Sequence, residues 1–175
     1  MIGTYRDTDL SGQSSIEATI LSKTDFVVGW DNPLIRAAQY LSSKAWMGLA
    51  QIDEIHLADM AEFGVLGRTH LISVTAEDLA NFEFLLYGRA TPRAIGRDLS
   101  DRRLGAISNP TYRPFVLESY RAIREIKAST LTDVRMRLPQ IETRFRRLLT
   151  PLGRGNEITY VLGTINVVAP NANPT

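Results

Sequence analysis

Asn81-Phe82-Glu83-Phe84-Leu85-Leu86-Tyr87-Gly88 is the stretch of this 175-residue sequence on which the fold depends. Its aromatic and apolar residues are typical of a β-strand, and the glycine marks the end of that strand. Residues 69–75 are also β-branched and apolar, and the short turn 76–78 separates the two segments. The sequence therefore predicts a pair of neighbouring strands at residues 69–75 and 79–87.

Downstream of this pair the pattern changes twice. Residues 89–110 are irregular and are punctuated by proline and glycine, whereas residues 112–127 place apolar side chains at helical spacing. Three further strands are expected at 129–138, 141–152 and 157–168, with tight turns between them. Two strands, a helical crossover and a three-strand meander predict an α+β fold, in which helices cover one face of a five-stranded antiparallel sheet.

Upstream of the strand pair the sequence predicts helices. Asp31-Asn32-Pro33 has the residues of a helix start, and residues 33–49 continue it as an amphipathic helix. A second helical piece is expected at 53–63. We therefore divide the chain into a polar N-terminal arm, a helical segment, a sheet domain and a C-terminal tail. The corresponding residues are 1–28, 29–66, 67–169 and 170–175.

This order of elements resembles that of PAS domains. The stretch 81–88, followed by Gly96-Arg97-Asp98-Leu99-Ser100-Asp101-Arg102-Arg103-Leu104, is similar to the second strand and the first helical turns of that family. Residues 145–152 and 161–165 resemble the last two PAS strands. The patterns are most like the stand-alone PAS subfamily that is abundant in alphaproteobacteria, although Asp101 stands where that family has a second glycine. The resemblance implies a sensory or regulatory module that binds a small molecule or a protein partner.

In a PAS domain the ligand pocket lies between the inner face of the sheet and the crossover helices. The resemblance thus makes one set of aromatic, apolar and hydroxyl side chains the candidate pocket lining: Phe82, Phe84, Leu86, Tyr112, Phe115, Tyr120, Thr132, Val134, Met136, Phe145, Leu149 and Ile165. The apolar stripe of the first helix predicts a homodimer interface made by Leu34, Ala38, Leu41 and Ala45. With no output domain recognised, a signal is expected to pass by protein contact.

Several kinds of chemistry lack the residues they need. The sequence has no cysteine, which excludes disulfides, covalent flavin photochemistry and other thiol-linked chromophores. His56 and His70 have no partner at a metal-binding spacing, and the helix at 112–127 has no histidine, so neither a metal nor haem is expected. A nucleophile elbow and a phosphate loop are also missing, so we expect no enzyme and no catalytic residue. The identity of any ligand, including non-covalent flavin, stays open.

The charges are unevenly distributed. Residues 1–88 contain 12 acidic and 5 basic residues, whereas residues 89–150 contain 6 acidic and 14 basic ones. The arginines at 135, 137, 144 and 146 would repel one another across neighbouring strands unless acids such as Asp133 and Glu142, or the acidic first half, offset them. Nucleic acid is not expected, because few aromatic residues accompany these arginines.

No membrane span or signal peptide is recognised, so a cytoplasmic protein is expected. The alternative functional hypothesis is a small pocket-containing enzyme or carrier with a cone-like α+β fold. A weaker third hypothesis is an arginine-mediated nucleic-acid binder.

Overall fold

The computed structural model describes residues 4–8, 12, 14–22, 25–26, 28–29, 31–45, 48–90, 99, 101–139 and 141–168. Within them the strands are β1 (Thr4–Thr8), β2 (Ser15–Leu21), β3 (Thr69–Ser73), β4 (Glu83–Tyr87), β5 (Thr130–Leu138), β6 (Ile141–Arg154) and β7 (Glu157–Val168). The α-helices are α1 (Asn32–Lys44), α2 (Leu57–Glu62) and α4 (Tyr112–Ile126). Short 3-10 turns are η2 (Ile52–Glu54), η3 (Leu66–Arg68), η4 (Leu79–Asn81) and η5 (Leu104–Ala106). Residues 96–98 and 100 of the PAS-like run, and the predicted tail 170–175, lie outside the described residues.

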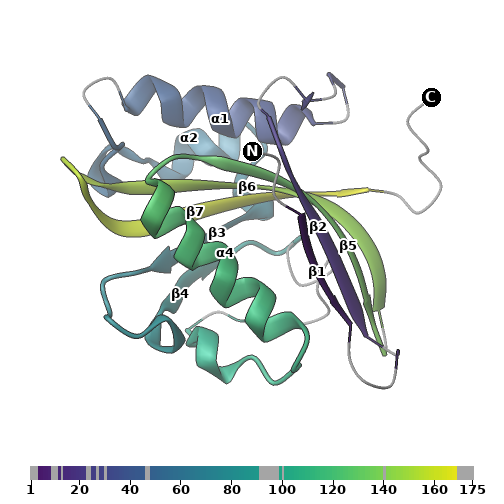
Figure 1. Ribbon diagram of the computed structural model, residues 1–175. Helices are drawn as coiled ribbons and strands as arrows, with labels where there is room; N and C mark the ends of the chain where they lie inside the picture. The colour runs from purple at the N-terminus through teal and green to yellow at the C-terminus, as the bar shows by residue number, and fades with distance from the viewer. Residues whose placement is uncertain are drawn as a thin grey trace.

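All seven described strands belong to one antiparallel sheet in the order β1-β2-β5-β6-β7-β3-β4. The five strands from β3 to β7 are those that the sequence predicted, arranged as a strand pair, a crossover and a meander. This is consistent with a PAS-like fold. The expected number of strands was wrong, because β1 and β2 extend the sheet beyond β5 (Figure 1).

The hairpin of β1 and β2 lies within the segment that the sequence predicted to be a polar arm. In β2, Ile16 and Ala18 alternate with partly exposed residues, and they pair with Met136 and Val134 of β5. Burial of such side chains contributes roughly 25 cal/mol for each Å² of apolar surface removed from water. The hairpin is therefore an integral edge of the sheet.

Helices cover both faces of the sheet rather than the single face expected from the sequence. In Figure 1, α1 and α2 lie on one side of the sheet and α4 lies on the other. The α4 face is packed with aromatic and branched residues, including Phe82, Phe115, Phe145 and Ile165. A second apolar core on the α1 face includes Leu131, Leu148, Leu152 and Leu162. Successive strand residues point to opposite faces, so β6 supplies Phe145 and Leu149 to the core under α4 and Leu148 and Leu152 to the core on the α1 face.

The α1 helix uses its apolar stripe inside the chain. Leu34 and Leu41 are at most 3% exposed, and Ala38 and Ala45 pack against the same core on the α1 face. The predicted dimer interface through these four residues is thereby corrected, because the sheet of the same chain already covers the stripe. The helix also ends at Lys44, earlier than the expected residue 49.

The α4 helix matches its predicted range closely. At its start, the Asn109 side chain accepts hydrogen bonds from the backbone N–H groups of Thr111 and Tyr112. At its end, Lys127 adopts a left-handed conformation with φ of 54° and closes the last turn. Phe115, Tyr120 and Ile123 face the sheet, so α4 covers the core on this side of the sheet.

Candidate ligand-binding site

Arg147 is a buried cation on the α4 face of the sheet. The alternation of β6 directs Phe145, Arg147 and Leu149 toward α4, and only 4% of the Arg147 residue surface is exposed. Its Nη2 donates a hydrogen bond of 2.7 Å to Ser119 Oγ on α4, and its guanidinium lies 4.8 Å from the centre of the Phe115 ring. Its buried Nε has no hydrogen-bond partner.

No ion pair among the described residues includes Arg147. Burial lowers the pKa of Arg147 from its ordinary value. Arginine nevertheless stays protonated in proteins, because its ordinary pKa is above 12. The core under α4 thus holds a positive charge that no described carboxylate neutralises.

His70 and Tyr120 form a second buried polar contact on this face. His70 Nε2 and the Tyr120 hydroxyl are 2.8 Å apart, and His70 Nδ1 has no hydrogen-bond partner. Burial, together with the charge of Arg147, lowers the pKa of His70 to about 3. Burial raises the pKa of Tyr120 far above its usual value and that of Tyr112 to about 12. Around neutral pH, Arg147 is therefore the charged member of this group.

A glycine makes room for the buried histidine. Gly163 of β7 is paired with His70 of β3, and the imidazole ring lies against the glycine. A Cβ atom at position 163 would lie 2.1 Å from His70 Nε2, far inside van der Waals contact. The histidine therefore depends on the absence of a side chain on the neighbouring strand.

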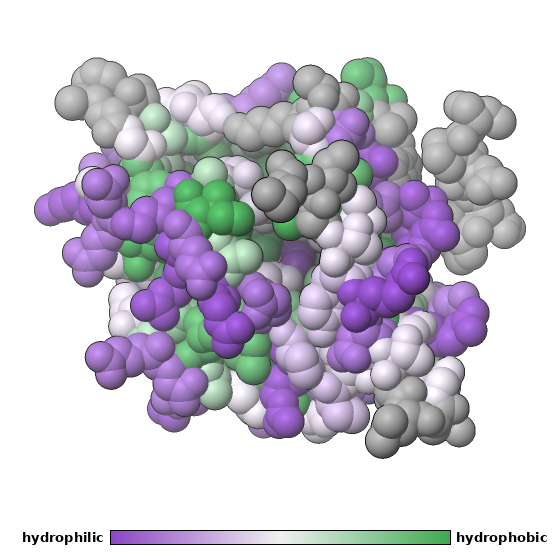
Figure 2. Space-filling model, in the orientation of Figure 1, coloured by the Kyte–Doolittle hydropathy of each residue, from purple (hydrophilic) through white to green (hydrophobic). Residues whose placement is uncertain are grey.

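Arg147 also lines a cavity of about 250 Å³ between α4 and the strands β1, β2, β5 and β6. Figure 2 shows this face of the molecule, which is hollowed between α4 and the hairpin. The walls are mainly apolar, and hydroxyl groups lie near the arginine. The lining residues include Tyr5, Ala18, Phe115, Ser119, Thr132 and Leu149. A cavity with apolar walls and a few convergent polar groups is typical of a small-molecule site.

The candidate lining residues divide between this cavity and the core. Phe115, Thr132 and Leu149 line the cavity. Most of the other candidate residues are buried in the core under α4, and Tyr112 is partly buried against that core. The buried candidates are Phe82, Phe84, Tyr120, Val134, Met136, Phe145 and Ile165. Leu86 is half-buried and lies outside both apolar cores.

Sequence reasoning missed the polar members of the site, Arg147 and Ser119, and also missed the buried contact of His70 with Tyr120 in the adjoining core. One signal was available for Arg147, since it has the same strand parity as Phe145 and Leu149, which the sequence placed on the pocket side. The dense arginine run of β6 concealed this, because its neighbours Arg144 and Arg146 face the other way.

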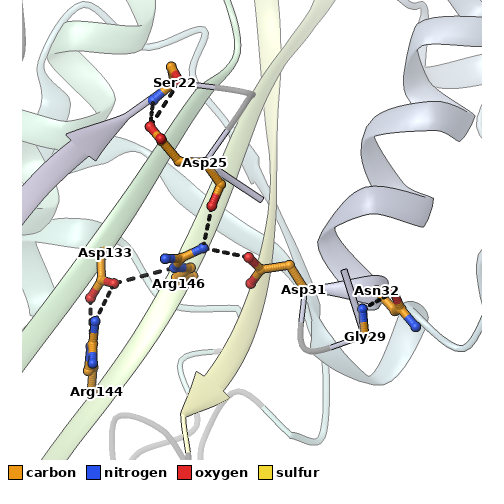
Figure 3. Close-up of polar contacts among 8 residues, drawn as sticks. All are labelled: Ser22, Asp25, Gly29, Asp31, Asn32, Asp133, Arg144 and Arg146. Atoms are coloured by element: carbon orange, nitrogen blue, oxygen red, sulfur yellow. Dashed lines mark hydrogen bonds and ion pairs between the residues drawn. The ribbon is translucent and has the colours of Figure 1, made fainter. Parts of the chain in front are cut away.

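The arginines on the α1 face are matched by acids (Figure 3). Arg144 donates to both carboxylate oxygens of Asp133 at 3.0 and 2.8 Å, and Arg146 donates to the same carboxylate at 3.3 Å. Arg146 also donates to fully buried Asp31 at 2.5 Å and to the Asp25 carbonyl at 2.8 Å. Burial opposes ionisation of Asp133, but the hydrogen bonds from both arginines outweigh it and lower the pKa of that carboxyl.

This network has a structural role. It attaches the segment before α1 to the sheet, and the Asp25 carboxylate fixes that segment further by accepting hydrogen bonds from Ser22 (Figure 3). Two hollows of about 430 and 450 Å³ lie near these strands, but both are lined by acids as well as arginines. The expectation that nearby acids offset the arginines is confirmed for Arg137, Arg144 and Arg146, whereas no ion pair among the described residues includes Arg135.

Comparisons with known proteins give little guidance. No protein-family model and no curated protein matches this chain. One similar solved structure is described as an RNA-binding Light-Oxygen-Voltage receptor, with 14% sequence identity and a TM-score of 0.43. The alignment covers 93% of this chain, which spans 39% of the length of that receptor chain.

In the described part of the chain, no helix combines the length and apolar character needed to cross a bilayer. Nor do three or more histidine, aspartate or glutamate side chains gather there in a way that could hold a metal ion.

Proposed function

We propose that this chain is a PAS-type sensory or regulatory module that binds a small molecule in the cavity under α4. One observation carries the proposal: buried Arg147 lines a cavity and keeps a hydrogen-bond donor without a partner. An unpaired buried charge costs several kcal/mol, and a ligand that meets it would recover part of that energy.

The polar groups beside the cavity support binding rather than catalysis. With a pKa of about 3, His70 is a poor general base near neutral pH, and its Nε2 is already engaged with Tyr120. Ser119 receives a hydrogen bond from the cationic Arg147, which cannot act as a base toward it. The enzyme alternative would instead require a residue that can accept a proton from a substrate.

Native mass spectrometry of the gently purified protein tests whether it carries a ligand, and a thermal-shift screen of neutral, anionic and cationic compounds extends the search. Ala122→Phe would fill the cavity from α4 and should abolish the response. Glu125→Phe, at an exposed position of the same helix, is the matched control. The proposal fails if no compound binds, or if both variants respond as the wild type does.

The proposed protein partner and homodimer need a surface other than the α1 stripe. Light scattering measures the oligomeric state directly, and repeating it with a bound compound tests whether the ligand changes it. If the protein is a monomer under both conditions, the homodimer hypothesis is wrong, and a signal would have to pass through contact with a different protein.

A further inference from the structure

The chemistry of the cavity restricts the ligand that the proposed function requires. Arg147 is 4% exposed and its buried Nε has no partner, so a cation and an unused donor lie together at the wall of the cavity. A neutral ligand could satisfy the donor but would leave the charge unmatched. A cationic ligand would add repulsion in a region where water screens it poorly. The arrangement therefore favours an anion.

The guanidinium is already held in one orientation. The bond from Nη2 to Ser119 and the cation–π contact with Phe115 both restrain it. Arginine prefers to bind carboxylates through two parallel hydrogen bonds, and a guanidinium held in place loses little entropy when they form. Thr132, which pairs with Arg147 across β5 and β6 and also lines the cavity, offers a hydroxyl beside it.

The remaining charge near the cavity does not replace the missing anion. Glu118 lines the same cavity, but it pairs with Arg121 on the exposed surface of α4. A single arginine matches a ligand with one negative charge. A phosphate monoester carries between one and two charges at neutral pH and would need more donors than this site provides.

The size and the walls of the cavity limit the rest of the ligand. About 250 Å³ is somewhat more than the roughly 150 Å³ of an engineered cavity that holds benzene. Ala18, Phe115 and Leu149 present apolar surface, which suits a hydrocarbon body and not a second polar group. A monocyclic aromatic acid or a short-chain fatty acid satisfies both limits.

We propose that the cavity under α4 binds a small monocarboxylate whose carboxylate pairs with Arg147 and whose apolar body lies between α4 and the β1–β2 hairpin. This inference rests on the proposed ligand-binding function. It names Arg147 as the residue that determines specificity for charge, and Ser119 and Phe115 as the residues that position it.

Titration calorimetry with benzoate and hexanoate, against the neutral amides benzamide and hexanamide, tests the proposal. A charge-assisted hydrogen bond is worth about 1.5–3 kcal/mol, so each acid should bind about 10- to 150-fold more tightly than its amide. Arg147→Met should remove this preference. Arg135→Met, an exposed position on the neighbouring strand that lines the charged hollows of the α1 face, should preserve it.

The comparison of acid with amide on the wild-type protein stands even if Arg147→Met fails to fold. If the amides bind as well as the acids, the carboxylate inference is wrong and the proposed ligand-binding function survives. If Arg147→Met and Arg135→Met lose acid binding equally, the carboxylate binds at another surface. This outcome also overturns the inference. If no compound of any charge binds in the wider screen, the proposed function itself fails.

Discussion

The buried histidine should make the stability of this protein fall as the solution becomes acidic. His70 is 4% exposed, and its pKa in the folded protein is about 3. In the unfolded chain a histidine titrates near its ordinary pKa of about 6.5. Between these two values the unfolded chain binds one proton that the folded protein excludes. Stability must therefore decrease as the pH is lowered through this window.

The size of the effect follows from proton linkage. Each pH unit well inside the window changes the free energy of unfolding by about 1.36 kcal/mol, so lowering the pH from 7.5 to 4.5 costs roughly 2–3 kcal/mol. The effect is complete near pH 3. Asp133 adds a loss in the same direction as the pH approaches its own lowered pKa, because its ion pairs require the ionised carboxyl.

Replacing His70 by glutamine separates the two contributions, since glutamine does not titrate and keeps a donor for Tyr120. Urea unfolding followed by circular dichroism at pH 7.5, 6.5, 5.5 and 4.5 gives the free energy for each protein. The advantage of the wild type over His70→Gln should shrink by about 2–3 kcal/mol across this series. His56→Gln, at an exposed histidine, is the control and should leave the slope unchanged. A constant difference between the wild type and His70→Gln would refute the reasoning.

Two further substitutions probe the packing of the sheet. Gly163→Ala should lower the free energy of unfolding by roughly 1–3 kcal/mol through its collision with His70, and His70→Ala in the same chain should recover part of that loss in a double-mutant cycle. Arg146→Met should cost about 3–5 kcal/mol in urea unfolding, because it deprives the buried Asp31 carboxylate of its ion pair. For this second variant, a loss below 1 kcal/mol would show that the pair contributes little.

Local patterns in the sequence were sufficient for the central strands and for α4. The β5–β7 meander follows from alternation and short turns, and α4 follows from helical spacing. Even the matching of Arg144 with Asp133, and of Arg137 with Glu142, could be anticipated, because like charges on adjacent strands need nearby acids.

The N-terminal hairpin was harder to predict, for a physical reason. In β2, the strand next to the edge of the sheet, only one face is buried, so Ile16 and Ala18 alternate with residues whose polarity gives an arm-like composition. Its partner, β5, begins more than a hundred residues later, and no local pattern indicates such a pairing. The same limit hid the second helical layer, because β6 has buried residues on both faces and so shows no simple alternation of apolar and polar residues.

The hairpin that the sequence left out changes how the candidate site can work. Tyr5 of β1 lies 5.3 Å from Phe115, ring centre to ring centre, and Phe115 in turn makes a cation–π contact with Arg147. A ligand at Arg147 would thus contact the residues that hold the edge of the sheet in place. We therefore expect benzoate, if it binds, to slow hydrogen exchange at residues 4–8 and to leave exchange in α1, on the opposite face, unchanged. Equal protection of both segments would indicate global stabilisation, and the hairpin would then have no special part in reporting the ligand.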